Sequence, residues 1–378
     1  MQEAALYIHI PWCIRKCPYC DFNSHKSPEI IAEKTYVDHL IQDFKWDVEH
    51  FGKRHISSIF IGGGTPSLLS ANAYQYLFEE LNKIVAIDNA IEITMEANPG
   101  TAEQTRFLAY RKAGINRLSL GIQSFNPLHL RKLGRIHDDD QAHRAIQIAR
   151  EAGFNNINLD IMHGLPEQSM SEGLTDLEQA LSYQPEHLSW YQLTLEPNTV
   201  FYKNPPALPD EDTSYELEQN GLAMLHKKGF RRYEISAYCH DKHEAQHNLN
   251  YWLFGDYFGI GAGAHGKLSS NNNKTITRLQ KKRQPNDYQR DFGQYTCKQT
   301  LLTAEDICFE YMLNTTRLNC THSFKHFEQQ TGLTIDKLLP HLHTAQAKGF
   351  ITNTLTHWQI TPLGRQFTNE LQAIFLHS

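Results

Sequence analysis

Three cysteines within eight residues constrain this chain more than any other feature of its sequence. Cys13, Cys17 and Cys20 have the spacing C-x-x-x-C-x-x-C and directly follow an apolar run, Leu6–Ile10, that predicts a strand. Soft thiolates on one loop favour an iron–sulfur cluster or zinc. A structural zinc site or a fully ligated cluster needs four protein ligands, and a fourth nearby cysteine is absent. We therefore expect one open metal position for an exchangeable ligand, whereas three unrelated buried cysteines so close together are disfavoured.

The bulk properties of the chain fit a globular protein of more than one domain. It has 378 residues, of which 40% are hydrophobic and 21% charged, and its net charge is −6. This charge predicts no strong attraction to nucleic acid or to anionic membranes, and no apolar run is long enough to span a bilayer. The N-terminus lacks a secretion signal, and the odd number of cysteines, seven, suits a reducing compartment. We therefore expect a cytoplasmic protein.

Short β-branched runs alternate with amphipathic stretches over residues 1–200. This alternation predicts parallel βαβ units and an α/β fold, whose six strands lie in an open sheet or curl into a partial barrel. The predicted strands are Leu6–Ile10, Ser58–Ile61, Ile91–Met95, Arg117–Leu120, Asn156–Ile161 and His187–Leu193, and the predicted helices between them are Glu33–Glu49, Ala73–Val85, Ala102–Ala113, Asp140–Ala152 and Met170–Leu181.

Two further regions follow this predicted core. We expect residues 201–300 to form an elaboration, with a helix at Thr213–Lys228 and a strand at Tyr233–Tyr238, and residues 301–378 to form a smaller C-terminal domain. Helices followed by a hairpin are typical of a winged-helix domain, but no Lys/Arg-rich face accompanies them. Packing or partner docking is therefore favoured over DNA binding. The predicted C-terminal elements are helices at Glu305–Leu313, Ser323–Thr331, Ile335–Lys348 and Pro362–Leu376, and a strand–turn–strand pattern at Ile351–Thr361.

Glycine and polar residues follow successive strands of the predicted sheet, where the chemistry of parallel barrels gathers. The glycine run Gly62–Pro66 lets the backbone approach a ligand closely and offers N–H groups to an anion. Each such residue taken singly is equally a tight turn, a helix cap or a satisfied buried polar group. Their shared placement beside the cysteines favours a pocket for a small ligand whose amine and carboxylate close the open iron. The strand-end polar residues are Glu96, Gln123 and Asp160, and Arg135 is available to pair with a carboxylate.

Together these motifs resemble the radical S-adenosylmethionine (SAM) superfamily. Within it, the chain is similar to the oxygen-independent coproporphyrinogen III oxidase group, and most of all to the haem-chaperone branch of that group. The resemblance covers nearly the whole chain. It is carried by Tyr7–Cys13, Cys17–Cys20, Gly62–Pro66, Glu96–Gly100, Gly121–Gln123, Leu133–Arg135, Asp160 with Gly164–Pro166, and His247–Tyr251.

The resemblance implies a partial (βα)6 barrel of radical SAM type that carries a 4Fe–4S cluster and SAM. Cys13, Cys17 and Cys20 would ligate the cluster. Tyr19 would pack against the adenine of SAM, or would simply cover the cluster as an aromatic residue of the loop. The positions that match SAM contacts in the group are Tyr7, Gly63, Gly64, Thr65, Glu96, Gln123, Arg135 and Asp160.

The resemblance also implies haem binding. His247, Asn248 and Tyr251 match an H-N-x-x-Y element that is associated with haem in the group, and imidazole is a common axial ligand of haem iron. Without the family context, a lone surface histidine is the favoured interpretation of His247. His265, which follows a glycine run, is a second and less favoured candidate.

Two departures separate the chain from the oxidases of the group. Phe22 stands where those oxidases carry a further cysteine, and the first predicted strand, Leu6–Ile10, leaves no room for the N-terminal segment that helps to close their active site. We expect a haem chaperone that delivers haem to an acceptor protein, with a membrane-bound respiratory component among the candidate acceptors. The alternative is a radical SAM oxidoreductase that acts on a porphyrinogen. We assign no catalytic residue and expect no nucleic-acid partner.

Overall fold

A single twelve-stranded sheet forms the centre of the molecule. The computed structural model describes residues 2–100, 106–270 and 275–376, and the strand order is β14-β13-β12-β11-β1-β4-β5-β6-β7-β8-β10-β9. The α/β prediction and the six predicted parallel strands are confirmed, with ends that differ by up to three residues. These strands are β1 (Glu3–Ile10), β4 (His55–Gly63), β5 (Glu92–Ala97), β6 (Arg117–Gln123), β7 (Ile157–His163) and β8 (His187–Gln192).

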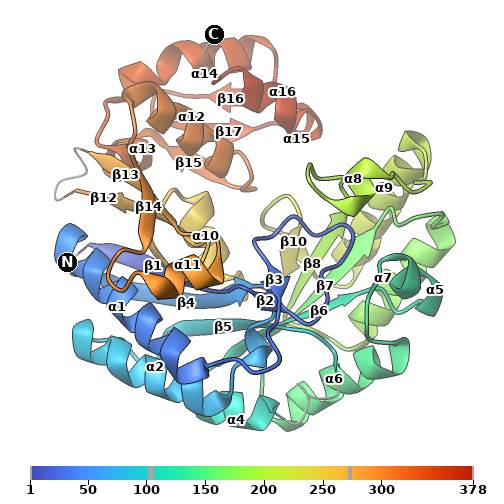
Figure 1. Ribbon diagram of the computed structural model, residues 1–378. Coiled ribbons are helices and arrows are strands. Elements are labelled where there is room, and N and C mark those ends of the chain that lie inside the picture. Colours follow the sequence, from blue (N-terminus) through green and yellow to red (C-terminus); the bar gives the residue numbers. More distant parts are fainter. Residues whose placement is uncertain (1, 101–105, 271–274, 377–378) are drawn as a thin grey trace.

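Helices surround the outside of this curved sheet (Figure 1). Two of them begin with capping boxes, in which Asp138 with Gln141 and Ser169 with Glu172 satisfy free N–H groups of the first turn. The predicted helix Ala102–Ala113 is confirmed only as a shorter helix, and residues 102–105 lie outside the described residues. The outer helices are α1 (Glu33–Phe51), α2 (Ala71–Ile84), α4 (Phe107–Lys112), α5 (Pro127–Lys132), α6 (Asp139–Glu151) and α7 (Met170–Ser182).

Residues 201–300 extend the sheet at both of its edges. After α8 (Val200–Lys203) and α9 (Glu211–Lys227), two short strands add to β8 in antiparallel fashion, β10 (Ala237–Cys239) and β9 (Arg231–Arg232). The predicted strand Tyr233–Tyr238 is therefore wrong in its bounds, because a turn occupies most of it. The chain then returns to the other edge through α10 (Gln246–Trp252), β11 (Tyr257–Ile260), β12 (His265–Ser269), β13 (Ile276–Lys281), α11 (Pro285–Arg290) and β14 (Thr296–Leu301).

This return matters because β11 pairs in parallel with β1. The first strand of the chain therefore lies between β4 and β11, inside the sheet, rather than at an edge. Helix α10 contacts both β1 and β4. Residues of 201–300 are thereby brought beside the first two strands of the core.

The C-terminal region has its own small sheet, and its hydrophobic core around Trp358 and Tyr311 also includes Phe254 and Ile276 of the preceding region. The predicted strand–turn–strand pattern is confirmed as β16 and β17, whereas the predicted last helix is interrupted at Phe367. A third strand, β15, is too short to stand out in the sequence. The elements are α12 (Ala304–Thr315), β15 (Thr321–Ser323), α13 (Phe324–Thr331), α14 (Leu339–Ala347), β16 (Ile351–Asn353), β17 (His357–Ile360), α15 (Pro362–Gln366) and α16 (Thr368–Ala373). Among the described residues, no helix is both long and apolar enough to cross a bilayer.

A fully buried ion cluster ties α1 to β13. The Lys281 Nζ atom donates to Asp43 Oδ1 at 2.6 Å and to Asp47 Oδ1 at 2.7 Å, and all three side chains are completely enclosed. The other oxygen of Asp43 accepts hydrogen bonds from the Gly261 N–H at 3.1 Å and from the Tyr288 hydroxyl at 2.7 Å. The cluster therefore also fixes the turn between β11 and β12.

Candidate functional site

The three cysteines lie on a loop near the carboxyl ends of the parallel strands (Figure 1). The loop begins and ends in a short parallel pair, β2 (Trp12–Cys13) and β3 (His25–Lys26). All three thiols are free and half-buried. Burial raises the pKa of the Cys13 thiol and raises that of Cys20 to about 11. Metal binding at this loop must therefore release protons.

The donor chemistry of this loop fits a 4Fe–4S cluster. Each thiolate would bind a different iron at a different corner of the cluster, so the three sulfur atoms need not converge on one point. In the described part of the chain, no three His, Cys, Asp or Glu side chains are gathered tightly enough to hold a single metal ion. The Arg135 guanidinium donates to Cys17 Sγ at 3.7 Å.

The glycine run after β4 packs tightly against the end of β1. The Gly64 N–H donates to Ile10 O and the Thr65 N–H to Trp12 O, both at 2.7 Å. A Cβ atom on Gly64 would lie only 2.4 Å from Trp12 O. These N–H groups already have acceptors, so the expectation that the run offers them to an anion is not met at these two positions. What the glycines provide is the close approach of the two strand ends.

Two half-buried carboxyl groups lie on β5 and β7, Glu96 near the end of β5 and Asp160 in the middle of β7. Glu96 Oε2 accepts from the Gly63 N–H at 3.1 Å, and burial together with nearby Asp160 raises the pKa of Glu96 to about 8. Glu96 has no positively charged partner among the described residues. Asp160 is better satisfied, since it accepts from Ser119 Oγ at 2.9 Å and Asn158 Nδ2 at 2.8 Å, although burial raises its pKa as well. A half-buried carboxyl group without a cation fits an amino group of a ligand such as SAM.

The half-buried Glu96 carboxyl group should lower the stability of the protein at high pH. Its folded-state pKa of about 8 lies above the ordinary value of 4.5. The stabilising contribution of its protonation is therefore fully present below about pH 4.5 and is lost as the pH rises through about 8. A Glu96→Gln variant, which keeps an acceptor for the Gly63 N–H, should be more stable than the wild type above this range by on the order of 1 kcal/mol. Thermal melts at several pH values measure this difference.

The exposed Glu178 on α7 provides the matched control. Glu178→Gln should leave the pH dependence of the melting temperature unchanged. If the difference in stability between Glu96→Gln and the wild type were the same at acid and at alkaline pH, the raised pKa of Glu96 would be contradicted.

The remaining predicted SAM residues lie around the same strand ends but contact protein groups. Arg135 Nη2 donates to Asn98 Oδ1 at 2.6 Å and to Gly121 O at 2.7 Å, so this side chain joins β5, β6 and the cysteine loop. Gln123 has a positive φ of 69° and its Oε1 accepts from the Tyr191 hydroxyl at 2.8 Å. Tyr19 packs near Phe201, with 6.4 Å between the ring centroids. Their contacts with SAM stay predictions.

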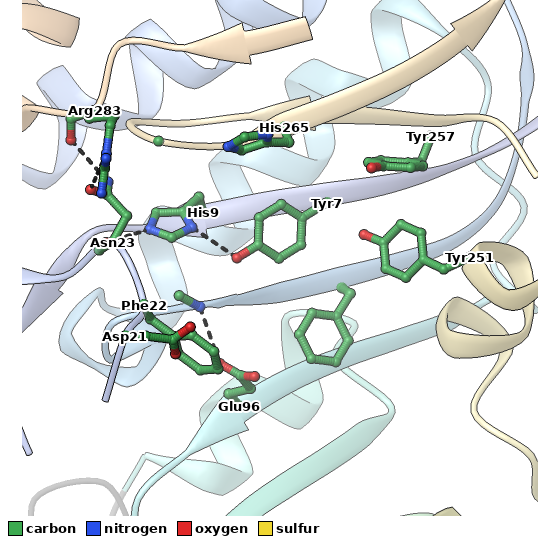
Figure 2. Close-up of a pocket in the computed structure, with 13 residues that line it drawn as sticks. Tyr7, His9, Asp21, Phe22, Asn23, Glu96, Tyr251, Tyr257, His265 and Arg283 are labelled. Atoms are coloured by element: carbon green, nitrogen blue, oxygen red, sulfur yellow. Dashed lines mark hydrogen bonds between the residues drawn. The ribbon is translucent and has the colours of Figure 1, made fainter. Parts of the chain in front are cut away.

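A cavity of about 540 Å³ opens beside these groups. Figure 2 shows Tyr7 and His9 of β1 in its middle, with Phe22 and Glu96 on one side and His265 and Arg283 on the other. The cavity thus joins a predicted SAM residue, Glu96, to residues from the second half of the chain.

Several lining residues were missed by the sequence analysis. His9 hydrogen-bonds through Nδ1 to the Tyr7 hydroxyl and through Nε2 to Asn23 O, both at 2.8 Å, and burial lowers its pKa to about 4. The period-two alternation of strand β1, which places residues 7 and 9 on one face, was a usable signal for His9. Arg283 had no such signal, because only tertiary structure brings it to the cavity.

The three residues of the predicted haem element, His247, Asn248 and Tyr251, do not all face the cavity. His247 is not a surface residue, as its isolated sequence context favoured, but is 2% exposed. Its ring stacks on Phe60 at 4.7 Å between centroids and meets Tyr251 edge-on at 4.4 Å. Of the three motif residues, only Tyr251 lines the cavity.

Comparison with known protein families gives two matches. Residues 7–180 match the family described as the radical SAM superfamily, and residues 302–367 match the family described as the HemN C-terminal domain. The first match contains the cysteine loop and the strand ends of the candidate site. The second covers most of the small C-terminal region.

Full-length relatives are also found. The chain is 47% identical to "Heme chaperone HemW" of Escherichia coli (strain K12), with coverage of 100% of this chain and 99% of the relative. It is 34% identical to "Heme chaperone HemW" of Bacillus subtilis (strain 168), with 98% of each chain covered. Among solved structures, coproporphyrinogen III oxidase (HemN) of Escherichia coli matches with a TM-score of 0.82 over 99% of this chain and 90% of that one. Since the identity is 22%, this last similarity concerns the fold.

Proposed function

Because the chain belongs to the HemW group of the radical SAM superfamily, we propose that it binds haem and passes it to an acceptor protein. The observation that carries this proposal is the identity of 44–47% with several relatives named heme chaperone HemW, along the whole length of the chain. A match restricted to the radical SAM region would support only the cofactors. Here the similarity also includes α10, β11 and β12, which supply part of the cavity.

The shape and chemistry of the cavity support haem as the cargo. Its volume of about 540 Å³ is in the range of cofactor and ligand sites, which are mostly apolar with a few polar groups. A porphyrin offers a flat apolar ring and two carboxylates. The cavity offers the aromatic rings of Phe60, Tyr251 and Tyr257 for the porphyrin ring, and the guanidinium of Arg283 for a carboxylate.

We further propose that the cysteine loop carries a 4Fe–4S cluster and that the adjoining strand ends hold SAM. Cys13, Cys17 and Cys20 would bind the cluster, and Arg135, which donates to Cys17 Sγ, would hold that side chain in place. Glu96 would accept hydrogen bonds from the amino group of SAM, and the remaining predicted contacts are Tyr7, Gly63, Gly64, Thr65, Gln123 and Asp160. When bound, the cluster and SAM supply radical chemistry; the residues named here bind and orient them.

The acceptor follows from the proposed role but not from any contact in the molecule. We propose a cytoplasmic chaperone whose acceptor is a haem protein, with membrane-bound respiratory components among the candidates. For the C-terminal region, residues 301–378, we propose packing or partner docking rather than DNA binding, because its sequence carries no Lys/Arg-rich face.

Haem titration and an oxidase assay on one anaerobic preparation test this function. We expect the reconstituted protein to bind one haem with a saturable absorbance change and to leave coproporphyrinogen III undecarboxylated. The absorbance change should be the same with and without added SAM if SAM is not required for loading. Turnover to protoporphyrinogen would contradict the chaperone role and favour the radical SAM oxidoreductase instead, whereas no saturable haem binding would contradict haem as the cargo.

A further inference from the structure

His247, the histidine of the H-N-x-x-Y element, is enclosed so fully that it cannot reach an iron atom in this conformation. Phe60 and Tyr251 pack against its ring, and the residue is 2% exposed. Both ring nitrogens are buried and have no hydrogen-bond partner among the described residues. An axial ligand must present a nitrogen to the haem iron. The closed conformation therefore excludes haem, and it also bears the cost of burying an imidazole without partners.

His247 belongs to the first turn of α10, and this turn is capped from outside the helix. The N-cap residue is Ala245, whose side chain accepts no hydrogen bond from the free N–H groups of the turn. The Gln246 N–H donates instead to Glu92 Oε1 of β5, at 3.0 Å. A carboxylate also suits the positive end of a helix. Glu92 thus supplies the cap that Ala245 lacks.

Glu92 is held on the side of the sheet and lies far from the predicted SAM residues. Its Oε2 atom is 3.9 Å from Arg117 Nε, and its Oε1 atom accepts a long hydrogen bond from Thr94 Oγ1 at 3.4 Å. Glu92 begins β5, whereas Glu96 is near the end of that strand. Four residues of strand separate the two by about 13 Å. The cap of α10 is therefore at the opposite end of β5 from the candidate SAM site.

The C-terminal half of α10 is anchored much more firmly than its first turn. Asn250 Nδ2 donates to Asp256 O at 2.9 Å, and the Arg317 guanidinium lies 4.2 Å from the centre of the Trp252 ring. Two residues after the helix, Phe254 is fully buried in the hydrophobic core of the C-terminal region. The helix can therefore unwind at its first turn while its other end stays in place.

We propose that the first turn of α10 is a gate that Glu92 keeps closed, and that unwinding of this turn presents His247 to haem. Haem as the ligand of His247 follows from the proposed function, on which this inference rests. Glu92 is a positioning residue, because it acts on His247 through the backbone of the turn. The gate leaves the pocket beside Glu96 to SAM and explains how a buried histidine can serve as a haem ligand.

The reactivity of the His247 ring with diethyl pyrocarbonate tests the gate in the haem-free, full-length protein. Peptide mass spectrometry measures the rate of modification at this residue. We expect Glu92→Ala to raise this rate at least about fivefold, the scale set by loss of a hydrogen bond to a charged group. Glu92→Gln, which keeps an oxygen acceptor for the Gln246 N–H, should restore most of the protection.

Glu186 provides the matched control, because its carboxylate also binds a backbone N–H at the start of a parallel strand. It accepts from the Ile157 N–H and from Arg150 Nη1, both at 2.9 Å. Glu186→Ala should leave the rate at His247 as in the wild type. Equal rates in Glu92→Ala and Glu186→Ala would overturn the gate.

Ala245→Ser shifts the gate in the other direction, since serine is a good N-cap residue and alanine is a poor one. We expect the rate of modification at His247 to fall about fivefold, the value of one helix cap. Only the open fraction binds haem, so the rate of haem association should fall by the same factor and should rise in Glu92→Ala. An Ala245→Ser protein that loads haem as fast as the wild type would overturn the gate, even if Glu92→Ala folds poorly.

The two measurements separate the gate from the proposed function. Unchanged reactivity of His247 in both variants, together with normal haem binding, would overturn the gate and leave the chaperone role intact. The expected changes in reactivity without haem binding by the wild type would support the gate and overturn haem as the cargo.

Discussion

A Cys17→Ala variant is expected to lose its iron–sulfur cluster almost completely. With three protein thiolates and one exchangeable position, the cluster has no spare protein ligand. Removing Cys17 would leave two thiolates and would also leave the Arg135 guanidinium without the sulfur to which it donates at 3.7 Å. Iron content and visible absorbance after anaerobic reconstitution measure the loss.

The exposed Cys297 on β14 provides the control for this experiment. Cys297→Ala removes a thiol of the same kind outside the loop and should keep a full cluster. A full complement of iron in Cys17→Ala would show that our ligand set is wrong. Circular dichroism of both variants before reconstitution distinguishes a lost cluster from a lost fold.

A Lys281→Met variant is expected to be destabilised by about 3–5 kcal/mol, the usual cost of removing one partner from a buried ion pair. Among the described residues, Lys281 is the only cation within salt-bridge distance of Asp43 and Asp47, at 2.6 and 2.7 Å, and no part of the three side chains is exposed. Methionine has a similar length but leaves two carboxyl groups without a charge partner. Urea denaturation measures the change in the free energy of unfolding.

The loss of stability in Lys281→Met should be larger at alkaline pH than at acid pH. Burial raises the pKa of Asp47 to about 7, and Lys281 opposes that rise. Without the lysine, the folded-state pKa of Asp47 rises further. The stability that comes from protonating Asp47 is present at acid pH and is lost as the pH rises through this folded-state pKa. The destabilisation should therefore be smaller at about pH 5 than at about pH 8.

Lys282 is the matched control, since it forms a partly exposed ion pair with Asp291 at 2.7 Å. Lys282→Met should cost less than about 1 kcal/mol. Adding Asp43→Asn and Asp47→Asn to Lys281→Met should recover part of the loss, because it removes the unpaired charges. A Lys281→Met protein as stable as the control variant would contradict the account of the cluster.

Much of the core could be predicted from the sequence because its signals are local. The β-branched runs predicted β1 and β4–β8, since each buried parallel strand needs a continuous apolar stretch of its own. The spacing of Cys13, Cys17 and Cys20 predicted a metal loop for the same reason, as ligands within eight residues are close in any fold. The short strands β9, β10 and β15 escaped, because two or three residues carry too little pattern to distinguish them from loops.

The sequence by itself determined the family, the order of the core elements and the identity of the groups that carry metal chemistry. Only the tertiary structure decided which residues line the cavity. Because β11 pairs with β1, His265 and Arg283 line the same cavity as Tyr7 and His9. The packing of α10 on β1 and β4 encloses His247 instead of exposing it. Both outcomes depend on contacts between residues far apart in the sequence, such as Tyr7 and Gly259 of β1 and β11, which no local pattern of residues encodes.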